Sequence, residues 1–181
     1  NEDTIIIEDD GEGMTADEVN ERFLTVGYRR RKSRPALTNK GRHPMGRKGI
    51  GKLSLFSIAE TVEVHTAKDG EISAFVMRLS EMRNKIETGA SAYEPEVINA
   101  EPIEDGHGTR IILGGLKKRQ TIRTPLALRK RLARRFSIIG PQNNFEVFVN
   151  NKLVEPADRG YYNKIQYIWT YGDQSEVLED V

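Results

Sequence analysis

An acidic, glycine-rich segment, Asp9-Asp10-Gly11-Glu12-Gly13-Met14, follows directly on a short apolar run at residues 4–8. The run predicts a buried strand, and the segment after it predicts a turn at the strand's end. A calcium loop is disfavoured, because its carboxylates would need an alternating spacing. A carboxylate at a strand end can instead accept a hydrogen bond from an exocyclic amine, while glycines let a flat ring approach the backbone. A nucleobase pocket and a plain acidic turn are the two interpretations. The pocket residues would be Asp9, Gly11, Gly13 and Met14.

A second glycine-rich segment, residues 46–54, precedes an apolar helix that is predicted to begin near residue 49. It is not a P-loop, because Leu53 occupies the magnesium-binding Ser/Thr position and no strand leads directly into it. Free N–H groups and the positive end of the helix dipole would nevertheless meet at one spot, which suits phosphates. A flexible hinge is the alternative. The predicted phosphate-binding residues are Gly46, Lys48, Gly49, Ile50, Gly51 and Lys52.

A third segment, Gly106-His107-Gly108-Thr109, leads into a predicted strand at residues 109–113. Taken alone, it reads as an ordinary turn. In order and spacing, however, the three segments resemble the motifs of the GHKL ATPase superfamily, which includes gyrase B, heat-shock chaperones, histidine kinases and MutL. The first segment is similar to the D-x-G-x-G-M adenine motif, residues 46–51 to G-x-x-G-x-G, and Gly108-Thr109 to the G-T strand motif. Residues 23–51 look most like the bacterial MORC-like or chaperone-like branch.

This resemblance implies specific roles. Asp9 would accept a hydrogen bond from the adenine N6 amine, partly through a water shared with Thr109. Gly13 and Met14 would line the ring, and residues 49–52 would present amides to the phosphates. Residues 15–48 would form an ATP lid. The implied ligands are ATP or ADP, with Mg²⁺ in the parent protein.

The family's E-x-x-x-N helix, whose Glu activates water and whose Asn holds magnesium, has no counterpart upstream of Asp9 in this sequence. We therefore assign no catalytic residue and no metal ligand. Phosphoryl transfer without these groups loses positioning and charge stabilisation. We expect the parent protein to be an ATPase and this chain to hydrolyse ATP barely or not at all.

The remaining pattern predicts strands at residues 61–66, 72–79 and 97–98, a helix within 121–139, a hairpin around Asn150-Asn151 and an aromatic strand at 162–171. Hairpins dominate, so we expect an α+β two-layer sandwich with a mixed, mainly antiparallel sheet. By resemblance this is an N-terminally incomplete Bergerat-type fold. Residues 1–150 would form the ATP-binding domain, and residues 151–181 a C-terminal strand or the start of a further domain.

Composition narrows the classes of function. The 181 residues carry a net charge of +1 and contain no cysteine, which excludes disulfides and thiolate metal sites. No apolar run approaches a membrane span, and we expect a cytoplasmic protein. Residues 29–52 hold ten Lys/Arg and residues 117–135 nine more, with no acid in either segment. A lid that attracts triphosphate and a solvated helix face explain these segments; DNA binding is the rival interpretation.

The leading hypothesis is an ATP-binding domain of a GHKL-type ATPase, in which nucleotide binding closes a lid and drives a conformational or dimerisation switch. A homodimer is the expected assembly. Two alternatives remain open. One is a nucleic-acid-contacting switch module that binds nucleotide without turnover. The other is the catalytic domain of a sensor histidine kinase, although the sequence shows no obvious phosphoacceptor helix.

Overall fold

The computed structural model describes residues 4–25, 37, 41, 51–89, 93–117, 124–161 and 166–167. The chain divides into two compact units, Asn1–Gln120 and Thr121–Val181. No helix in the described ranges has both the length and the apolar character that a membrane crossing requires.

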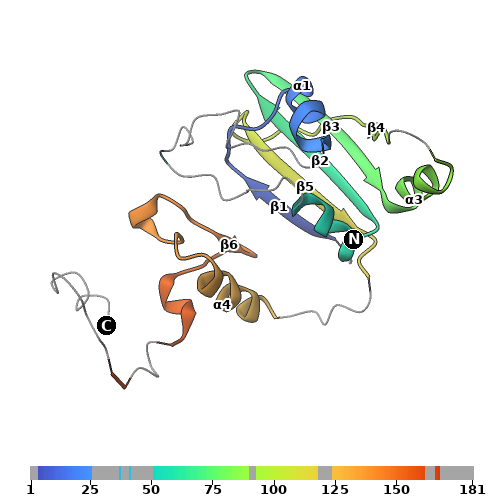
Figure 1. Cartoon of the computed structure of the whole chain (residues 1–181). Helices are drawn as coiled ribbons and strands as arrows, with labels where there is room; N and C mark the ends of the chain where they lie inside the picture. The colour runs from blue at the N-terminus through green and yellow to red at the C-terminus, as the bar shows by residue number, and fades with distance from the viewer. Residues whose placement is uncertain are drawn as a thin grey trace. The chain divides into compact units, whose positions relative to one another are not determined.

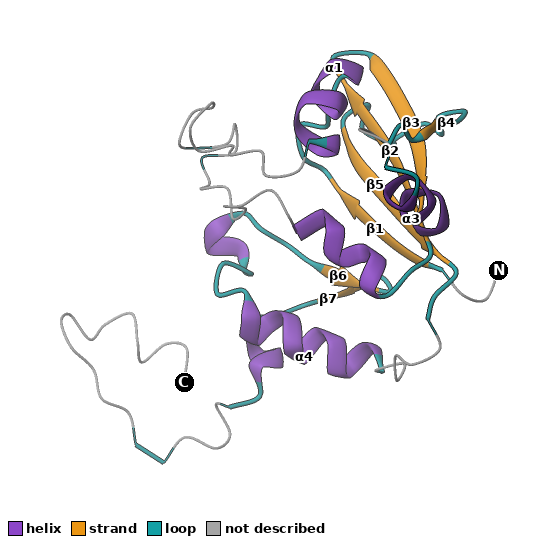
Figure 2. Cartoon of the chain, turned by 45° about the vertical axis from the view of Figure 1, so that its right-hand side comes forward, coloured by secondary structure: helices purple, strands orange, loops and turns teal. Residues whose placement is uncertain are grey.

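The first unit is built on a five-stranded sheet with the strand order β1-β5-β2-β3-β4, in which every pairing is antiparallel (Figures 1 and 2). Together with the helices, this sheet confirms the predicted α+β class. The strands are β1 Ile5–Asp9, β2 Thr61–Lys68, β3 Glu71–Arg78, β4 Glu96–Val97 and β5 Gly108–Gly114.

The helices of this unit agree only in part with the sequence pattern. Thr15 forms the predicted capping box with Glu18 at the start of α1 (Ala16–Glu18), which continues as the π-helix η1 (Val19–Leu24). The predicted apolar helix is a 3-10 helix, η2 (Gly51–Ser57), in the described residues. The helix α3 (Leu79–Glu87) was not predicted, because most of its residues are polar; Leu79 and Met82, three residues apart, are partly buried and pack against the core.

Strand alternation places one set of apolar side chains on the sheet face that the helices cover. The register places Leu113 opposite Val62, and Ile111 opposite Val64, in neighbouring strands. Opposed residues point to the same face, and every second residue along a strand shares that face. Val19 of η1 and Phe56 of η2 join this face in one core cluster. Both helical segments therefore pack against the same side of the sheet.

Residues 4–8 were predicted to form a buried strand. The segment does form a strand, but the prediction that it is buried is wrong. In the described structure, Ile5, Ile6 and Ile7 of β1 are 41%, 58% and 46% exposed. The cause is position, because β1 lies at the edge of the sheet and pairs with β5 alone. A β-branched run predicts a strand, but it cannot distinguish an edge strand from a central one.

The second unit contains α4 (Pro125–Arg135), which Thr124 caps and Pro125 begins. The predicted hairpin consists of β6 (Phe148–Val149) and β7 (Lys152–Leu153), and Asn150 and Asn151 take positive φ at its turn. Short 3-10 helices, η3 Pro141–Asn143 and η4 Pro156–Arg159, flank the hairpin. The unit's core is a small cluster of Ala133, Ile139, Val149 and Val154.

The expected domain division at residue 150 falls within this second unit, because α4 and the hairpin supply the same cluster. The domain boundary itself stays a prediction. The aromatic strand expected at residues 162–171 lies outside the described residues, apart from 166–167, which are not in a strand.

Candidate nucleotide-binding site

A row of polar side chains crosses three strands at one end of the apolar sheet face. The register pairs Asp9 of β1 with Thr109 of β5, and Thr109 with Thr66 of β2. These residues continue the alternation of Ile111 and Val64, so their side chains belong to the face that the helices cover. The start of the first glycine-rich segment therefore lies beside the end of the third, as the nucleobase hypothesis requires.

The carboxylate of Asp9 is oriented by its own turn. Its Oδ1 atom accepts a hydrogen bond from the backbone N–H of Gly11 at 2.9 Å. A Cβ atom at Gly11 would lie 2.5 Å from the same oxygen. His107 ties the third segment to this turn, because its Nδ1 donates to the carbonyl oxygen of Gly11 at 2.8 Å. The turn is thus held at both Asp9 and His107.

Gly13 and Gly108 allow the backbone to pass unusually close to neighbouring strands. Gly13 has a φ of +66°, and a Cβ atom there would lie 1.8 Å from the carbonyl oxygen of Ala67. Gly108 has a φ of +120°, and its Cβ atom would lie 2.2 Å from the carbonyl oxygen of Asp9. Both the dihedral angle and the contact exclude a side chain at either position. Close backbone approach was the reason for predicting a flat ligand here.

Thr66 joins the two glycine-rich segments, and the motif analysis missed it. Its hydroxyl accepts a hydrogen bond from the N–H of Met14 at 2.8 Å and donates to the carbonyl oxygen of Gly108 at 3.1 Å. The residue is 0% exposed. The strand pattern did contain a signal, because a hydroxyl follows Val62 and Val64 at the next core-facing position.

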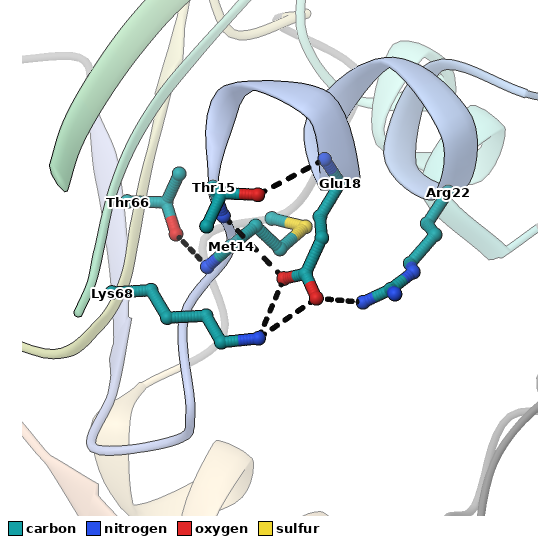
Figure 3. A network of polar contacts seen from close by, with 6 residues as sticks. All are labelled: Met14, Thr15, Glu18, Arg22, Thr66 and Lys68. Carbon is teal, nitrogen blue, oxygen red and sulfur yellow. Dashed lines mark hydrogen bonds and ion pairs between the residues drawn. The ribbon is translucent and has the colours of Figure 1, made fainter.

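A second network fixes the helix that follows Met14 (Figure 3). The carboxylate of Glu18 accepts hydrogen bonds from Lys68 Nζ at 2.8 and 2.9 Å and forms an ion pair with Arg22. The same carboxylate accepts from the N–H of Thr15 at 3.4 Å, and the Thr15 hydroxyl accepts from the N–H of Glu18 at 3.3 Å. One side chain therefore caps α1 and links it to the end of β2.

The surroundings of Glu18 act on its pKa in opposite directions. Burial raises the pKa, but the hydrogen bonds from Lys68 and Thr15, together with the positive charges of Arg22 and Lys68, outweigh burial and lower it below its usual 4.5. The side chain is 13% exposed, so solvent screens these charges only partly. The folded state therefore favours the ionised carboxylate.

The start of the phosphate segment is attached to the same helical region. Lys52 Nζ donates to the carbonyl oxygens of Arg22 at 3.1 Å and Thr25 at 2.6 Å, and it lies 5.6 Å from the centroid of the Phe23 ring. Burial lowers the pKa of Lys52. Its side chain thus satisfies carbonyls at the end of η1, as a cation at a helix C-terminus does.

The phosphate site itself is described only in part. Gly51 opens η2, and the amides of Gly51 and Lys52 lie at that helix's start. The predicted phosphate-binding residues Gly46, Lys48, Gly49 and Ile50 lie outside the described residues. Among the residues that are described, no group of three or more histidine, aspartate or glutamate side chains is arranged to hold a metal ion.

The sequence of the chain matches a protein family described as "Histidine kinase-, DNA gyrase B-, and HSP90-like ATPase" over residues 1–109. The match covers more than half of the chain. This chain belongs to that ATPase family. The predicted GHKL resemblance is thereby confirmed, and the chain carries an ATP-binding module of the ATPase type.

This chain is also 38% identical over 174 residues to a protein named "Putative type II restriction enzyme HgiDII" from Herpetosiphon aurantiacus. The alignment covers 96% of this chain and 28% of that relative. The chain thus spans less than a third of the length of the relative.

Replacing Thr66 tests whether its hydroxyl holds the two glycine-rich segments together. Thr66→Val keeps the shape but leaves the N–H of Met14 and the carbonyl of Gly108 unpaired, so the free energy of unfolding should fall by about 1–3 kcal/mol. Thr66→Ser keeps both hydrogen bonds and loses one methyl group, at a cost of about 0.8 kcal/mol. Urea denaturation of both variants measures the difference. Equal stability of wild type and Thr66→Val would contradict the assigned role.

Titration tests the Glu18 network. A carboxyl whose pKa is lowered on folding stabilises the protein above its unfolded pKa, near 4.5, and loses that contribution as the pH falls through its folded pKa. Glu18→Gln should therefore cost about 1–3 kcal/mol at pH 7 and weaken the loss of stability on acidification. Glu21→Gln, an exposed change in η1, is the matched control. Identical pH profiles for Glu18→Gln and wild type would exclude this mechanism.

Proposed function

We propose that the chain binds ATP with the adenine ring on the polar row of Asp9, Thr109 and Thr66. The observation that supports this best is the position of the row at the end of an otherwise apolar, helix-covered sheet face. Asp9 supplies a fixed acceptor for the N6 amine. The glycine backbones of Gly13 and Gly108 leave room for a flat ring beside it.

The triphosphate would extend toward the start of η2, where the amides of Gly51 and Lys52 continue the predicted segment 46–52. The anchoring of Lys52 to the carbonyls of Arg22 and Thr25 supports this path, because it attaches the start of η2 to the end of η1, the helix that follows the first glycine-rich segment. Backbone amides at a helix start bind phosphate without a dedicated side chain.

We further propose that residues 15–48 act as the ATP lid. Val19 and Phe23 hold the beginning of this segment against the core, so closure would move the part that follows. The ten basic residues of 29–52 would lose mutual repulsion when a triphosphate is bound. Closure would then drive the conformational or dimerisation switch, with a homodimer as the expected assembly.

The relative's printed name supports a DNA-related setting. A type II restriction enzyme acts on DNA, so we propose that this module serves a longer protein that works on DNA. The sensor-kinase alternative has no comparable support.

Magnesium stays outside this proposal. Among the described residues, no three or more histidine, aspartate or glutamate side chains are grouped so that they could hold it. We therefore derive no hydrolytic step, and the proposal concerns nucleotide binding by the chain's own residues.

Asp9→Asn tests the adenine assignment. The variant replaces an acceptor of the N6 hydrogen bond by an amide of the same shape, so ATP affinity should fall by about 1–3 kcal/mol, or roughly 5- to 150-fold. Glu87→Gln on α3 makes the same change of charge at an exposed position outside the site and should bind ATP like wild type. Isothermal titration calorimetry measures both affinities.

Competition adds a second readout. GTP presents a carbonyl oxygen where ATP presents the N6 amine, so a carboxylate at that point repels it. GTP should therefore fail to displace a fluorescent ATP analogue. Unchanged ATP affinity in Asp9→Asn, or equal competition by ATP and GTP, would overturn the adenine assignment.

A further inference from the structure

The helix α4 contains no acidic residue, and the charge on its inner face is neutralised within the unit. Leu132 and Ala133 face the small core. Beside them, the guanidinium of Arg129 binds both carboxylate oxygens of Asp158 at 2.8–3.1 Å, and both side chains are largely buried. This bidentate pair accounts for the one inward-facing arginine of the helix.

The outer face of α4 carries a run of exposed cations, which we call the basic stripe: Lys130, Arg131, Arg134 and Arg135. Their spacing of three and four residues places them on one face of the helix. The small Ala127 lies on the same part of the helix surface. The second unit thus presents a strongly positive surface.

Most cations of the basic stripe form no ion pair within the described structure. In the part of the chain that the structure describes, no carboxylate forms an ion pair with Lys130, Arg131 or Arg135, whereas Arg134 Nε donates to the carbonyl oxygen of Arg159 at 2.6 Å. The pairs Lys130–Arg134 and Arg131–Arg135 place like charges four residues apart, which destabilises a helix. A bound polyanion would remove that repulsion.

We propose that the basic stripe is a binding surface for the phosphate backbone of duplex DNA. This proposal rests on the proposed function only for the choice of DNA as the polyanion. The basic stripe is a DNA-binding site that the proposed function does not include. Three of the four cations are arginine, whose planar fork of donors fits phosphate oxygens. From Lys130 to Arg135 the helix rises by roughly 7.5 Å, about two steps of one DNA strand. The stripe can therefore follow consecutive phosphates.

The surroundings of the stripe favour duplex DNA over other partners. No aromatic side chain lies in α4, so bases of a single strand would find no stacking platform. An amphipathic helix on a lipid surface needs a continuous free apolar face. In α4, Leu132 and Ala133 are packed in the core, and the exposed Leu126 and Leu128 are two residues apart and so do not share one face. Backbone contacts without base contacts give affinity that depends little on sequence.

The test measures binding of a short, random-sequence, fluorescein-labelled duplex to the full chain across a salt series, from about 50 to 200 mM. The stripe variant is Lys130→Gln/Arg131→Gln/Arg135→Gln, which leaves Arg134 and its contact to Arg159 in place. It should bind roughly tenfold or more weakly at low salt and lower the log–log salt slope by about 2.7, which is 0.9 for each charge removed. Glutamine is a good helix former, so α4 should persist.

The matched control is Arg83→Gln/Lys85→Gln/Lys152→Gln, which removes the same charge from exposed positions on α3 and β7. It should retain the affinity and the salt slope of wild type. Equal losses in both triple variants, no binding by wild type, or equal binding of the duplex, a single strand and anionic vesicles would each overturn the proposal.

ATP affinity of the stripe variant separates this proposal from the proposed function. The stripe variant should bind ATP like wild type, because the stripe belongs to the second unit. Loss of DNA binding with intact ATP binding supports the stripe. If the wild-type chain fails to bind ATP, the nucleotide-binding proposal is wrong. The DNA-binding proposal is unaffected, because the DNA measurement is made without nucleotide.

Discussion

The candidate site depends on the close approach of three backbone segments. These segments are the end of β1, the end of β2 and the start of β5. Gly13 and Gly108 permit this approach because they lack a Cβ atom, which at either position would collide with a carbonyl oxygen. The hydroxyl of Thr66 then satisfies one donor and one acceptor that the approach buries. Asp9 is placed beside Thr109 only because these segments are held together, so the geometry of the proposed adenine subsite follows from backbone packing.

Two lysines extend this packing to the helical layer. Lys68 reaches from the end of β2 to Glu18, and Lys52 reaches from η2 to the carbonyls at the end of η1. The segment between Met14 and Thr25 is thus fixed near both ends by a cation. Both lysines are therefore engaged within the described structure, so the proposed phosphate contacts of Gly51 and Lys52 are those of their backbone amides. In the second unit the opposite holds, because α4 retains cations that no described carboxylate neutralises.

Much of the site could be predicted from the sequence, because its motifs specify backbone behaviour. The glycines of residues 9–14 and 106–109 require turns and close approach, and those demands are local. The motifs did not reveal Thr66 and Lys68, because the partners of these residues lie 42 to 52 positions away in the sequence; for Thr66, strand alternation alone carried a signal. The exposure of Ile5 to Ile7 depends on strand order, which a β-branched run does not encode. The helix α3 was missed because its sequence is mostly polar, although Leu79 and Met82 stand at helical spacing and pack partly buried against the core.

The central claim is that one adenine nucleotide bridges the Asp9 row and the amides at the start of η2. Amide hydrogen exchange of the full chain with adenosine and with ATP tests it most directly. Adenosine should slow exchange in residues 11–15 alone, whereas ATP should slow exchange there and at Gly51 and Lys52 together. Protection by ATP in only one of these segments would contradict the account, because a single ligand that spans both must protect both.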